Sequence, residues 1–527
     1  MESHVQTSAL LHGKYGVLQF ASIACSFALG AWILYANKLF YHDDAYITLR
    51  YAHNFLEGHG IVWNAGEYVQ GYTNFLHLVL ISGLGLAGVN MVWASRVIGV
   101  LTFGLLVLAL QLFLRRSSRQ SLQERNLFHL PVILTLASAP LIVWSIGGLE
   151  GTLFALLTST GCLTFLAALD QPANWRLPMA SGVCLALAYL AHPTGLVFIG
   201  LSMIWLLITW KSRLIRSIVA FAAPCFVIVT TYTLWQFFYY GDVVPNTFYA
   251  KAGNFTIQRL IKGLRYMVSY AQQPPYLPIL ILFSVGYSIV AKKWHWHSKL
   301  TYLALIISGY TSLLVFIGGD HMQAFRLFLP LIVPLSYTFY LLLTYTIDTS
   351  NRIAVSLLTV MVLFLSGMQL GQARLNPKKE DPASRTGTII GKHIAKAWPE
   401  GSLVALNTAG STPYYAPQHR YIDMLGLNDR HIAKRIITKI EVRRQNASGH
   451  LKGDGNYVLS MAPDFIIVGP AHGTDISDPW FLSDLEMSRA PRFAQKYIRK
   501  QVRLNQRGEV IEQGGTLFTY YQRQGNS

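Results

Sequence analysis

Charged side chains are scarce in this sequence. Only 13% of the 527 residues are Asp, Glu, Lys or Arg, whereas 52% are apolar, and the mean hydropathy is +0.35. This composition excludes an ordinary soluble globular chain. Cysteine is also rare: all four cysteines lie within apolar runs and none follows residue 371, which excludes a disulfide or zinc framework in that part of the chain.

Long apolar runs recur from Tyr15 to Leu370, and their lengths are those of helices that cross a bilayer. The chain is therefore predicted to be a polytopic α-helical membrane protein. We expect about eleven spans, at residues 17–37, 95–114, 127–145, 150–169, 177–191, 194–210, 215–238, 275–291, 300–317, 326–345 and 353–371. The glycine-rich stretch 75–89 is expected to be interfacial or re-entrant.

The density of charge changes near residue 371. Residues 1–371 carry 21 Lys and Arg, while the 156 residues after them carry 22, together with 14 of the 25 acidic residues. This shift predicts a membrane domain at 1–371 and a soluble domain at 372–527. The second domain is expected to be α/β, with strands at 403–406, 465–468 and 516–521 and helices at 385–398 and 429–440.

Basic residues fall into alternate loops between the predicted spans. One set of loops and flanks holds Lys14, Arg115, Arg116, Arg119, Arg125, Arg176, Lys211, Arg213, Arg216, Lys292, Lys293, Lys299 and Arg352. The positive-inside rule makes that side cytoplasmic, so nearly every polar cluster suited to chemistry, and the C-terminal domain, face the other side. Since orientation explains the basic loops, the net charge of +18 does not predict a nucleic-acid partner.

The first outward segment begins with two adjacent carboxylates, Asp43 and Asp44. The helical pattern from His42 to Phe55 places apolar residues on one stripe and polar residues on another, which predicts a helix along the membrane surface. Adjacent anions repel, so a neighbouring cation, a bound metal ion or a raised pKa on one of them is expected. The alternative is that one Asp merely caps the helix.

Other outward-facing residues have side chains suited to a sugar or a phosphate. The first loop offers Trp63, Asn64, Tyr72 and Asn74, although an aromatic belt at the membrane surface explains its rings equally well. Later loops offer Glu150, His192, Lys251, Asp320, His321 and Arg326. Arginine at a membrane boundary suits a lipid phosphate; the alternatives are a capping role for Glu150, a structural His192 and snorkelling by Arg326.

Several of these motifs together resemble a known family. DDAYITLRYAHNFLEGHGIVWNAGEYVQGYTN, GGLEGTLFALL, YGDVVPNTFYAK, the GGD loop followed by Arg326, and YIDMLGLNDRHIAK are similar to motifs of the membrane arabinofuranosyltransferases of the GT-C glycosyltransferase superfamily. The resemblance spans both predicted domains, and the first-loop motif is its most specific part. One motif departs from the superfamily: His192-Pro193-Thr194-Gly195 stands where relatives often have Arg-Pro-(Asp/Glu)-Gly, so His192 would need a proton to bind phosphate.

The resemblance implies a GT-C fold in a bacterial inner membrane, with the active site and the C-terminal α/β domain on the periplasmic side. It implies that Asp43 and Asp44 are catalytic and that a polyprenyl phosphate carries the donor sugar. Arg326, with His321 or Lys251, would stabilise the charge that develops on the phosphate. Asp320, Glu150 and His192 are further candidates for the donor site. Trp63, Asn64, Tyr72 and Asn74 would bind a cell-envelope glycan or glycolipid acceptor.

The expected reaction is inverting transfer of a pentose, arabinofuranose first, with Asp43 or Asp44 as the base. A Mg²⁺ or Mn²⁺ ion on the acidic pair is left open, because carboxylates suit such ions as ligands. Three alternatives also stay open: transfer of another lipid-linked sugar, a lipid-linked-glycan transporter or flippase, and an assembly scaffold. The sequence shows no repeat of the kind typical of transporters, which favours an enzyme.

Overall fold

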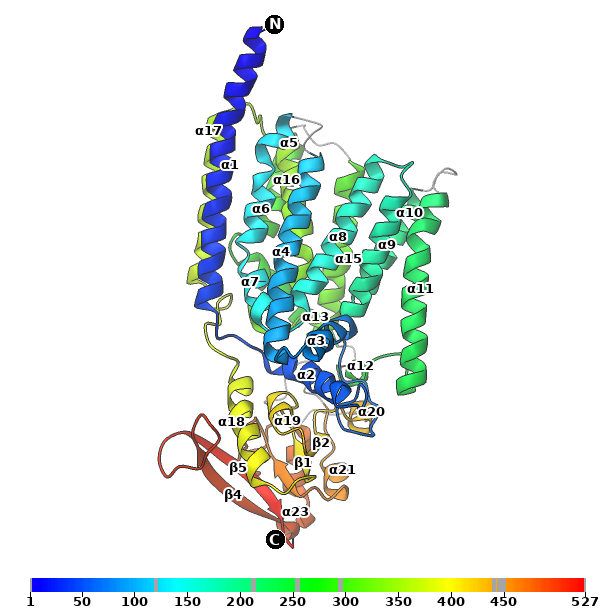
Figure 1. Ribbon diagram of the computed structural model, residues 1–527, viewed down its shortest axis with the longest axis vertical. Coiled ribbons are helices and arrows are strands. Elements are labelled where there is room, and N and C mark those ends of the chain that lie inside the picture. The colour runs from blue at the N-terminus through cyan, green and yellow to red at the C-terminus, as the bar shows by residue number, and fades with distance from the viewer. Residues whose placement is uncertain are drawn as a thin grey trace.

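In the computed structural model, long helices stand side by side and a domain with a β-sheet lies beyond one end of them (Figure 1). The structure describes residues 2–117, 122–209, 215–251, 256–291, 297–437, 442 and 452–525. The N-terminus and the C-terminus lie at opposite ends of the longest axis (Figure 1). Five basic residues used to orient the loops, Arg119, Lys211, Arg213, Lys292 and Lys293, lie outside the described residues.

A helix or bent pair of helices coincides with each of the eleven predicted spans. Among the described residues, seven helical segments are long and apolar enough to cross a membrane, and a pair of helices bent by 44° makes eight if it counts as one span. The seven are parts of α1 (Glu2–Ala36), α4 (Met91–Ser117), α8 (Gly151–Asp170), α11 (Ile215–Tyr240), α15 (Ser298–Ile317), η2 with α16 (Gln323–Leu331 and Ile332–Thr346), and α17 with η3 (Arg352–Gly367 and Met368–Gly371). The bent pair joins α5 (Leu122–Leu127) and α6 (His129–Leu136) to α7 (Ala139–Ile146), and α9 (Arg176–Ala191), α10 (Gly195–Ile208) and α14 (Leu277–Val290) are shorter apolar helices.

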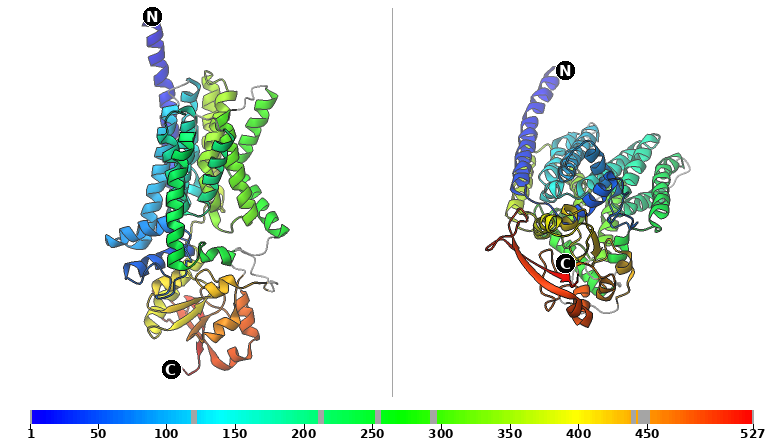
Figure 2. Two further views of the ribbon diagram at one scale, coloured as in Figure 1. Left: turned by 90° about the vertical axis from the view of Figure 1, so that its right-hand side faces the viewer. Right: turned by 60° about the horizontal axis from the view of Figure 1, so that its bottom comes forward.

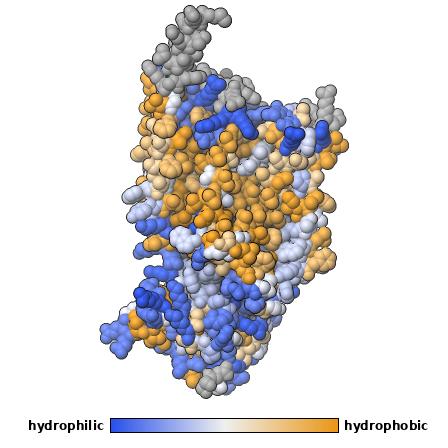
Figure 3. All heavy atoms as spheres, in the orientation of Figure 1, coloured by the Kyte–Doolittle hydropathy of each residue, from blue (hydrophilic) through white to orange (hydrophobic). Residues whose placement is uncertain are grey.

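The surface of the helical part agrees with a membrane environment. On the face shown in Figure 3, apolar residues form a broad band across the helices, and most of the hydrophilic residues lie at both ends of them and over the sheet domain. Large exposed apolar side chains such as Phe226, Phe283 and Phe364 belong to this band of helices. Lipid contact removes the cost of exposing them to water, so this part is a multi-pass membrane domain.

Four further helices lie at the end of the membrane domain nearest the sheet: α2 (Asp43–Leu56), α3 (Phe75–Leu86), α12 (Asn246–Lys251) and α13 (Ile257–Ala271). Figures 1 and 2 show α2 and α3 lying across the direction of the long helices rather than along it. Thr256 begins α13 as its N-cap by accepting a hydrogen bond from the backbone N–H of Arg259. The placement of α3 agrees with the interfacial position expected for residues 75–89.

The soluble domain contains one five-stranded sheet of order β2-β1-β3-β5-β4. The strands are β1 (Leu403–Leu406), β2 (Arg420–Asp423), β3 (Phe465–Ile467), β4 (Tyr497–Leu504) and β5 (Thr516–Arg523), and β1 runs parallel to β2 and β3 while β5 is antiparallel to β3 and β4. Its helices are α18 (Pro382–Ala397), α19 (Ser411–Tyr415), α20 (Arg430–Lys434), α21 (Gly455–Ser460), α22 (Leu482–Arg489) and α23 (Pro491–Lys496). The three predicted strands are confirmed, whereas α20 is shorter than the helix predicted at 429–440, of which residues 438–440 lie outside the described part.

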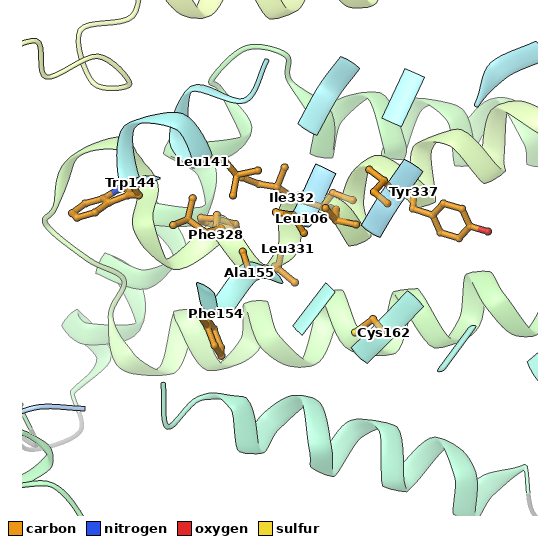
Figure 4. Packing of buried hydrophobic residues seen from close by; sticks show 14 of the residues in the cluster. Leu106, Leu141, Trp144, Phe154, Ala155, Cys162, Phe328, Leu331, Ile332 and Tyr337 are labelled. Atoms are coloured by element: carbon orange, nitrogen blue, oxygen red, sulfur yellow. The ribbon is translucent and has the colours of Figure 1, made fainter. Parts of the chain in front are cut away.

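The core of the membrane domain fixes the segment that carries Arg326. Phe328, Leu331 and Ile332, which follow Arg326 on η2 and α16, belong to the same buried cluster as Leu141 of α7 and Ala155 of α8 (Figure 4). The backbone kinks just before them, at Ala324 (φ 52°) and Phe325 (φ 47°). The kink and the buried residues after it hold Arg326 at the membrane boundary.

Candidate functional site

The segment α2 lies between the two domains and is buried by both. Ala45 and Leu49 belong to the apolar core of the membrane domain. Ile47 and Tyr51, on another face, belong to a second cluster that includes Val404 and other residues of the soluble domain. The two faces expected from the sequence are present, but the second face meets the soluble domain rather than water.

Arg50 shows how closely α2 and the soluble domain fit. Its side chain is only 2% exposed, and its guanidinium donates hydrogen bonds to the carbonyl oxygens of Trp63 (2.7 Å), His419 (3.0 Å) and Pro413. The guanidinium carbon lies 4.7 Å from the ring centroid of Tyr421. Two of the three carbonyls and the ring come from the soluble domain, so a buried charge joins the domains.

The cap of α2 is a histidine. His42 is the N-cap, and its Nδ1 accepts a hydrogen bond from the backbone N–H of Asp44 (3.2 Å). The alternative that one aspartate of the pair merely caps the helix is therefore wrong, because the imidazole occupies that role. Both carboxylates are left for other contacts.

Asp43 points into the soluble domain. Its Oδ1 accepts two hydrogen bonds from Ser411, one from the backbone N–H (2.9 Å) and one from the hydroxyl (2.6 Å), and the residue is only 6% exposed. Burial is the main cause that raises the pKa of Asp43, the charges of Asp44 and Asp381 add to it, and the two bonds from Ser411 oppose it, so that the resulting pKa is about 6. A raised pKa on one member of the pair was one of the three expected ways to relieve the repulsion, beside a neighbouring cation and a bound metal ion.

Asp44 points elsewhere, and its side chain is 38% exposed. Its carboxylate accepts no hydrogen bond within the described ranges; His42 Nδ1 is 3.9 Å from Oδ1. Burial alone would raise the pKa of Asp44, but His42, Lys251, Arg326 and His321 outweigh it and hold the pKa below its ordinary value.

Arg326 is held by Asp320. The Nη2 and Nε atoms of Arg326 lie 3.1 and 3.2 Å from Asp320 Oδ2, and His321 Nδ1 lies 3.5 Å from Asp320 Oδ1. Burial would raise the pKa of Asp320, but Arg326 and His321 outweigh it and lower the pKa. Asp320 therefore stays ionised and orients the guanidinium, which also lies 5.8 Å from the ring centroid of Trp144.

Glu150 and His192 complete the predicted donor residues. Glu150 is the N-cap residue of α8, but its side chain makes no cap bond; Oε2 accepts a hydrogen bond from Asn74 (2.9 Å) instead. Burial lowers the pKa of His192 to about 4, and its Nδ1 lies 2.8 Å from Thr194 Oγ1. His192 is therefore neutral near pH 7, and a phosphate would find a hydrogen-bonding group there rather than a charge.

The predicted donor residues share one electrostatic environment with Asp44. Lys251, Arg326 and His321 act on Asp44, and Arg326 also acts on Glu150. Within the domain, the backbone N–H of His42 donates to the carbonyl of Gly147 (3.2 Å), which ties the GGLE loop to the start of α2. Loops that are far apart in the sequence thus meet at the acidic pair.

The residues predicted to bind an acceptor, Trp63, Asn64, Tyr72 and Asn74, are each 2–3% exposed. Asn64 exchanges two hydrogen bonds with the backbone of Tyr421 (2.8 and 3.1 Å), and the hydroxyls of Tyr72 and Tyr240 are 3.1 Å apart. Their side chains are directed at protein partners in this arrangement. Their role in acceptor binding stays a prediction.

Sequence reasoning missed the contribution of the soluble domain. Besides Ser411, the rings of Tyr414 and Tyr415 lie 5.3 and 5.7 Å from the ring centroid of Tyr46 on α2. Ser411 and Asp43 are 368 residues apart in the chain, and the short segment GSTPYY carries no local signal that would connect them. Only the fold brings them together.

The acidic pair fits a divalent cation poorly. Across the described ranges, no group of three or more His, Cys, Asp or Glu side chains is placed to hold a metal ion. Asp43 Oδ1 is already occupied by two donors from Ser411, and the positive charges of Lys251 and Arg326 act on Asp44. Mg²⁺ held by one or two carboxylates usually takes its other ligands from waters and substrate phosphates, so the acidic pair by itself supplies only part of a site.

Comparison with known sequences gives two matches. Residues 378–520 match a domain of unknown function, DUF8728. The chain is also 26% identical, over 285 residues, to the terminal beta-(1->2)-arabinofuranosyltransferase of Mycobacterium tuberculosis (strain ATCC 25618 / H37Rv). The matched segment is 51% of this chain but only 43% of that relative, so less than half of the relative's length is covered.

Solved structures with a similar fold include ArnT from Cupriavidus metallidurans bound to undecaprenyl phosphate. That likeness has a TM-score of 0.51 at 13% identity and covers 78% of this chain and 86% of ArnT. The oligosaccharyltransferase of Archaeoglobus fulgidus gives a TM-score of 0.51 in the apo form (10% identity, 76% and 64% covered) and 0.52 in complex with Zn and sulfate (12% identity, 76% and 62% covered). The fold is that of the GT-C glycosyltransferases, as the first-loop motif predicted.

Proposed function

We propose that this GT-C chain is an inverting glycosyltransferase that moves a pentose, arabinofuranose first, from a polyprenyl phosphate to a glycan or glycolipid of the cell envelope. The observation that carries the proposal is the environment of Asp44: an ionised, partly exposed carboxylate beside the cationic residues Lys251 and Arg326. An arabinofuranosyltransferase among the relatives and an undecaprenyl phosphate on a protein of the same fold support the sugar and its carrier.

Asp44 serves as the general base in the proposed reaction. The acceptor hydroxyl gives its proton to Asp44 while its oxygen forms a bond to the anomeric carbon of the donor. The bond from that carbon to the phosphate oxygen breaks, the electron pair leaves with the polyprenyl phosphate, and the configuration at the carbon inverts. Base catalysis of this kind is typically worth about 10²- to 10⁴-fold in rate.

Arg326 stabilises the negative charge that develops on the leaving phosphate, with Lys251 and His321 as partners and Asp320 as the group that orients the guanidinium. A bound phosphate would also offset the positive charge near Asp44. The pKa of Asp44 would then rise toward the range in which a carboxylate is an effective base.

The distribution of basic loop residues supports the proposed side of the membrane. The end of the membrane domain that carries Asp44 would face the periplasm, and the described basic loop residues Arg115, Arg116, Arg176 and Lys299 would face the cytoplasm. A donor anchored in the bilayer suits this arrangement, because nucleotide sugars are charged and do not cross the membrane unaided.

The test is a transfer assay with the purified full-length protein in detergent, supplied with polyprenyl-phospho-arabinose and an oligoarabinan acceptor. We expect transfer by the wild type, a loss of at least about 10²-fold in Asp44→Asn, and unchanged transfer in Asp170→Asn. Asp170 is a matched control because it ends α8 and forms an ion pair with Lys299 (2.7 Å), outside the site. If the protein transfers sugar only from another lipid-linked donor, the proposed identity of the sugar is wrong. If it transfers sugar from no donor but moves a lipid-linked sugar across the membrane of vesicles, the proposal that it is a transferase is contradicted.

A further inference from the structure

The soluble domain reaches the acidic pair through the two hydrogen bonds from Ser411 to Asp43. We propose that Ser411 is a positioning residue for this centre: by holding Asp43, it fixes the first turn of α2 and thereby the direction of Asp44. The inference rests on the proposed function for its kinetic consequences. It assigns the two neighbouring carboxylates different roles, with Asp44 at the substrate and Asp43 in a contact between domains.

The geometry of α2 separates the two carboxylates. Neighbouring residues on a helix point about 100° apart, so a helix packed between two domains can direct one side chain to each. Asp43, Tyr46 and Arg50 follow the spacing of one helical face, and each contacts residues of the soluble domain between Ser411 and His419. Asp44 lies off that face, beside charges that belong to the membrane domain.

The contact is closely built on the side of the soluble domain. A Cβ atom added at Gly410 would lie 2.2 Å from the carbonyl oxygen of Asp43 and 2.4 Å from its Oδ2. A Cβ atom added at Gly387 of α18 would lie 2.2 Å from Ser411 Oγ. Glycine at both positions is therefore needed for Ser411 to reach Asp43. The backbone N–H and the hydroxyl of Ser411 both donate to the same oxygen, Asp43 Oδ1.

The contact persists whichever charge state Asp43 adopts. Both bonds run from Ser411 to Oδ1, so Oδ2 is the oxygen that can carry a proton without displacing either donor. A group that is satisfied and buried in this way is suited to hold a position rather than to exchange protons with a substrate. Asp44, without such bonds among the described residues, keeps its lone pairs for a ligand.

The kinetic test is a double-mutant cycle on transfer with Ser411→Ala and Asp43→Ala. Each single variant should lower kcat about 10-fold and leave KM for the donor nearly unchanged, because the substrate contacts remain. The double variant should lose no more than Asp43→Ala alone: Ser411→Ala removes only the hydroxyl bond and keeps the backbone N–H bond, whereas Asp43→Ala removes the acceptor of both. Asp43→Asn should recover part of the loss, because its amide oxygen still accepts from Ser411.

A contact that only holds the domains together would behave differently. Arg430→Ala is the matched control: Arg430 of α20 donates to the carbonyl oxygens of Tyr68 and Tyr240, which joins the domains without touching α2. It should lower the melting temperature without lowering kcat. Losses that add in the double variant, or an equal loss of kcat in Arg430→Ala, would overturn the positioning role.

Hydrogen exchange separates this inference from the proposed function. In detergent and without substrate, Ser411→Ala should speed the exchange of backbone amides in the first turn of α2, residues 44–47, by about 10-fold or more, and leave those of α8 unchanged. If the wild type transfers no sugar at all, the proposed function is wrong, but the exchange rates still test whether Ser411 positions the first turn of α2. Unchanged exchange at 44–47 would overturn the positioning of Asp44 by Ser411.

Discussion

The two sides of α2 differ in how many hydrogen-bond partners their polar groups have. On the side of the soluble domain, Asp43 is buried and accepts two hydrogen bonds, and Arg50 donates to three carbonyls. On the side of the membrane domain, Asp44 is partly exposed beside Lys251 and Arg326. Polar groups whose hydrogen bonds are all made within the protein stabilise its structure. An ionised group that lies near opposite charges and accepts no hydrogen bond from the described residues is available to a ligand.

Arg326→Ala should have the largest effect on the membrane side. We expect transfer to fall by about 10²- to 10³-fold, because a charged donor to the leaving phosphate is lost. Stability should fall as well, since Asp320 would be left buried without its partner. The double variant Arg326→Ala/Asp320→Ala should regain much of the melting temperature but none of the transfer; recovery of transfer would show that Arg326 acts only through stability.

Arg50→Met tests the side of α2 that faces the soluble domain. The substitution keeps an apolar stem but leaves three carbonyl oxygens without their donor, so the free energy of unfolding should fall by about 3 kcal/mol or more. Thermal unfolding in detergent and proteolysis between the domains would measure it. An unchanged melting temperature would contradict the view that this side is built for docking.

The pH dependence of kcat/KM distinguishes the two carboxylates as bases. A base works when it has lost its proton, so the rate falls as the pH drops through its pKa in the free enzyme. With Asp44 as the base, kcat/KM should show no acidic limb near pH 6, because the pKa of Asp44 lies below its ordinary value of 3.8. A limb near pH 6 that disappears in Asp43→Asn would identify Asp43, whose pKa is raised to about 6, as the base.

Lys251→Ala should have the smallest effect. Lys251 is exposed and forms no ion pair within the described part of the chain, so its charge is largely screened by water and salt. We expect KM for the donor to rise about 10-fold at low ionic strength, which is about 1.4 kcal/mol, and less at high salt. Lys434→Ala is the control, because Lys434 is already paired with Asp242 (2.9 Å) and should leave KM unchanged.

The sequence alone was sufficient to predict features that depend on local composition. Hydropathy located a helix or bent pair of helices at each of the eleven predicted spans, although only seven of the described helical segments, or eight with the bent pair, are long and apolar enough to cross a membrane. Apolar runs bounded by Gly, Pro or Asn located β1, β3 and β5. Strand β4, YIRKQVRL, was missed because four of its eight residues are exposed in an unbroken run and its charged residues hide the strand pattern. The motif around Asp43 and Asp44 was sufficient for the GT-C fold.

The sequence alone was not sufficient to predict contacts that depend on how distant segments of the chain pack together. Nothing local shows that Asp43 meets Ser411, or that Trp63 and Asn64 pack against Tyr421 instead of facing water. The use of His42 as the cap of α2 was missed for a related reason: aspartate is a common N-cap, and here Asp43 is instead held by Ser411, which is distant in the sequence.

The most direct measurement is the ratio of single-turnover transfer rates of Asp43→Asn and Asp44→Asn, prepared side by side and matched for melting temperature. Asn keeps the shape of Asp and an oxygen that accepts hydrogen bonds, but it cannot take the proton of an acceptor hydroxyl. The account predicts that Asp43→Asn is at least about 10-fold faster than Asp44→Asn. Equal rates, or a slower Asp43→Asn, would contradict the division of roles between the two carboxylates.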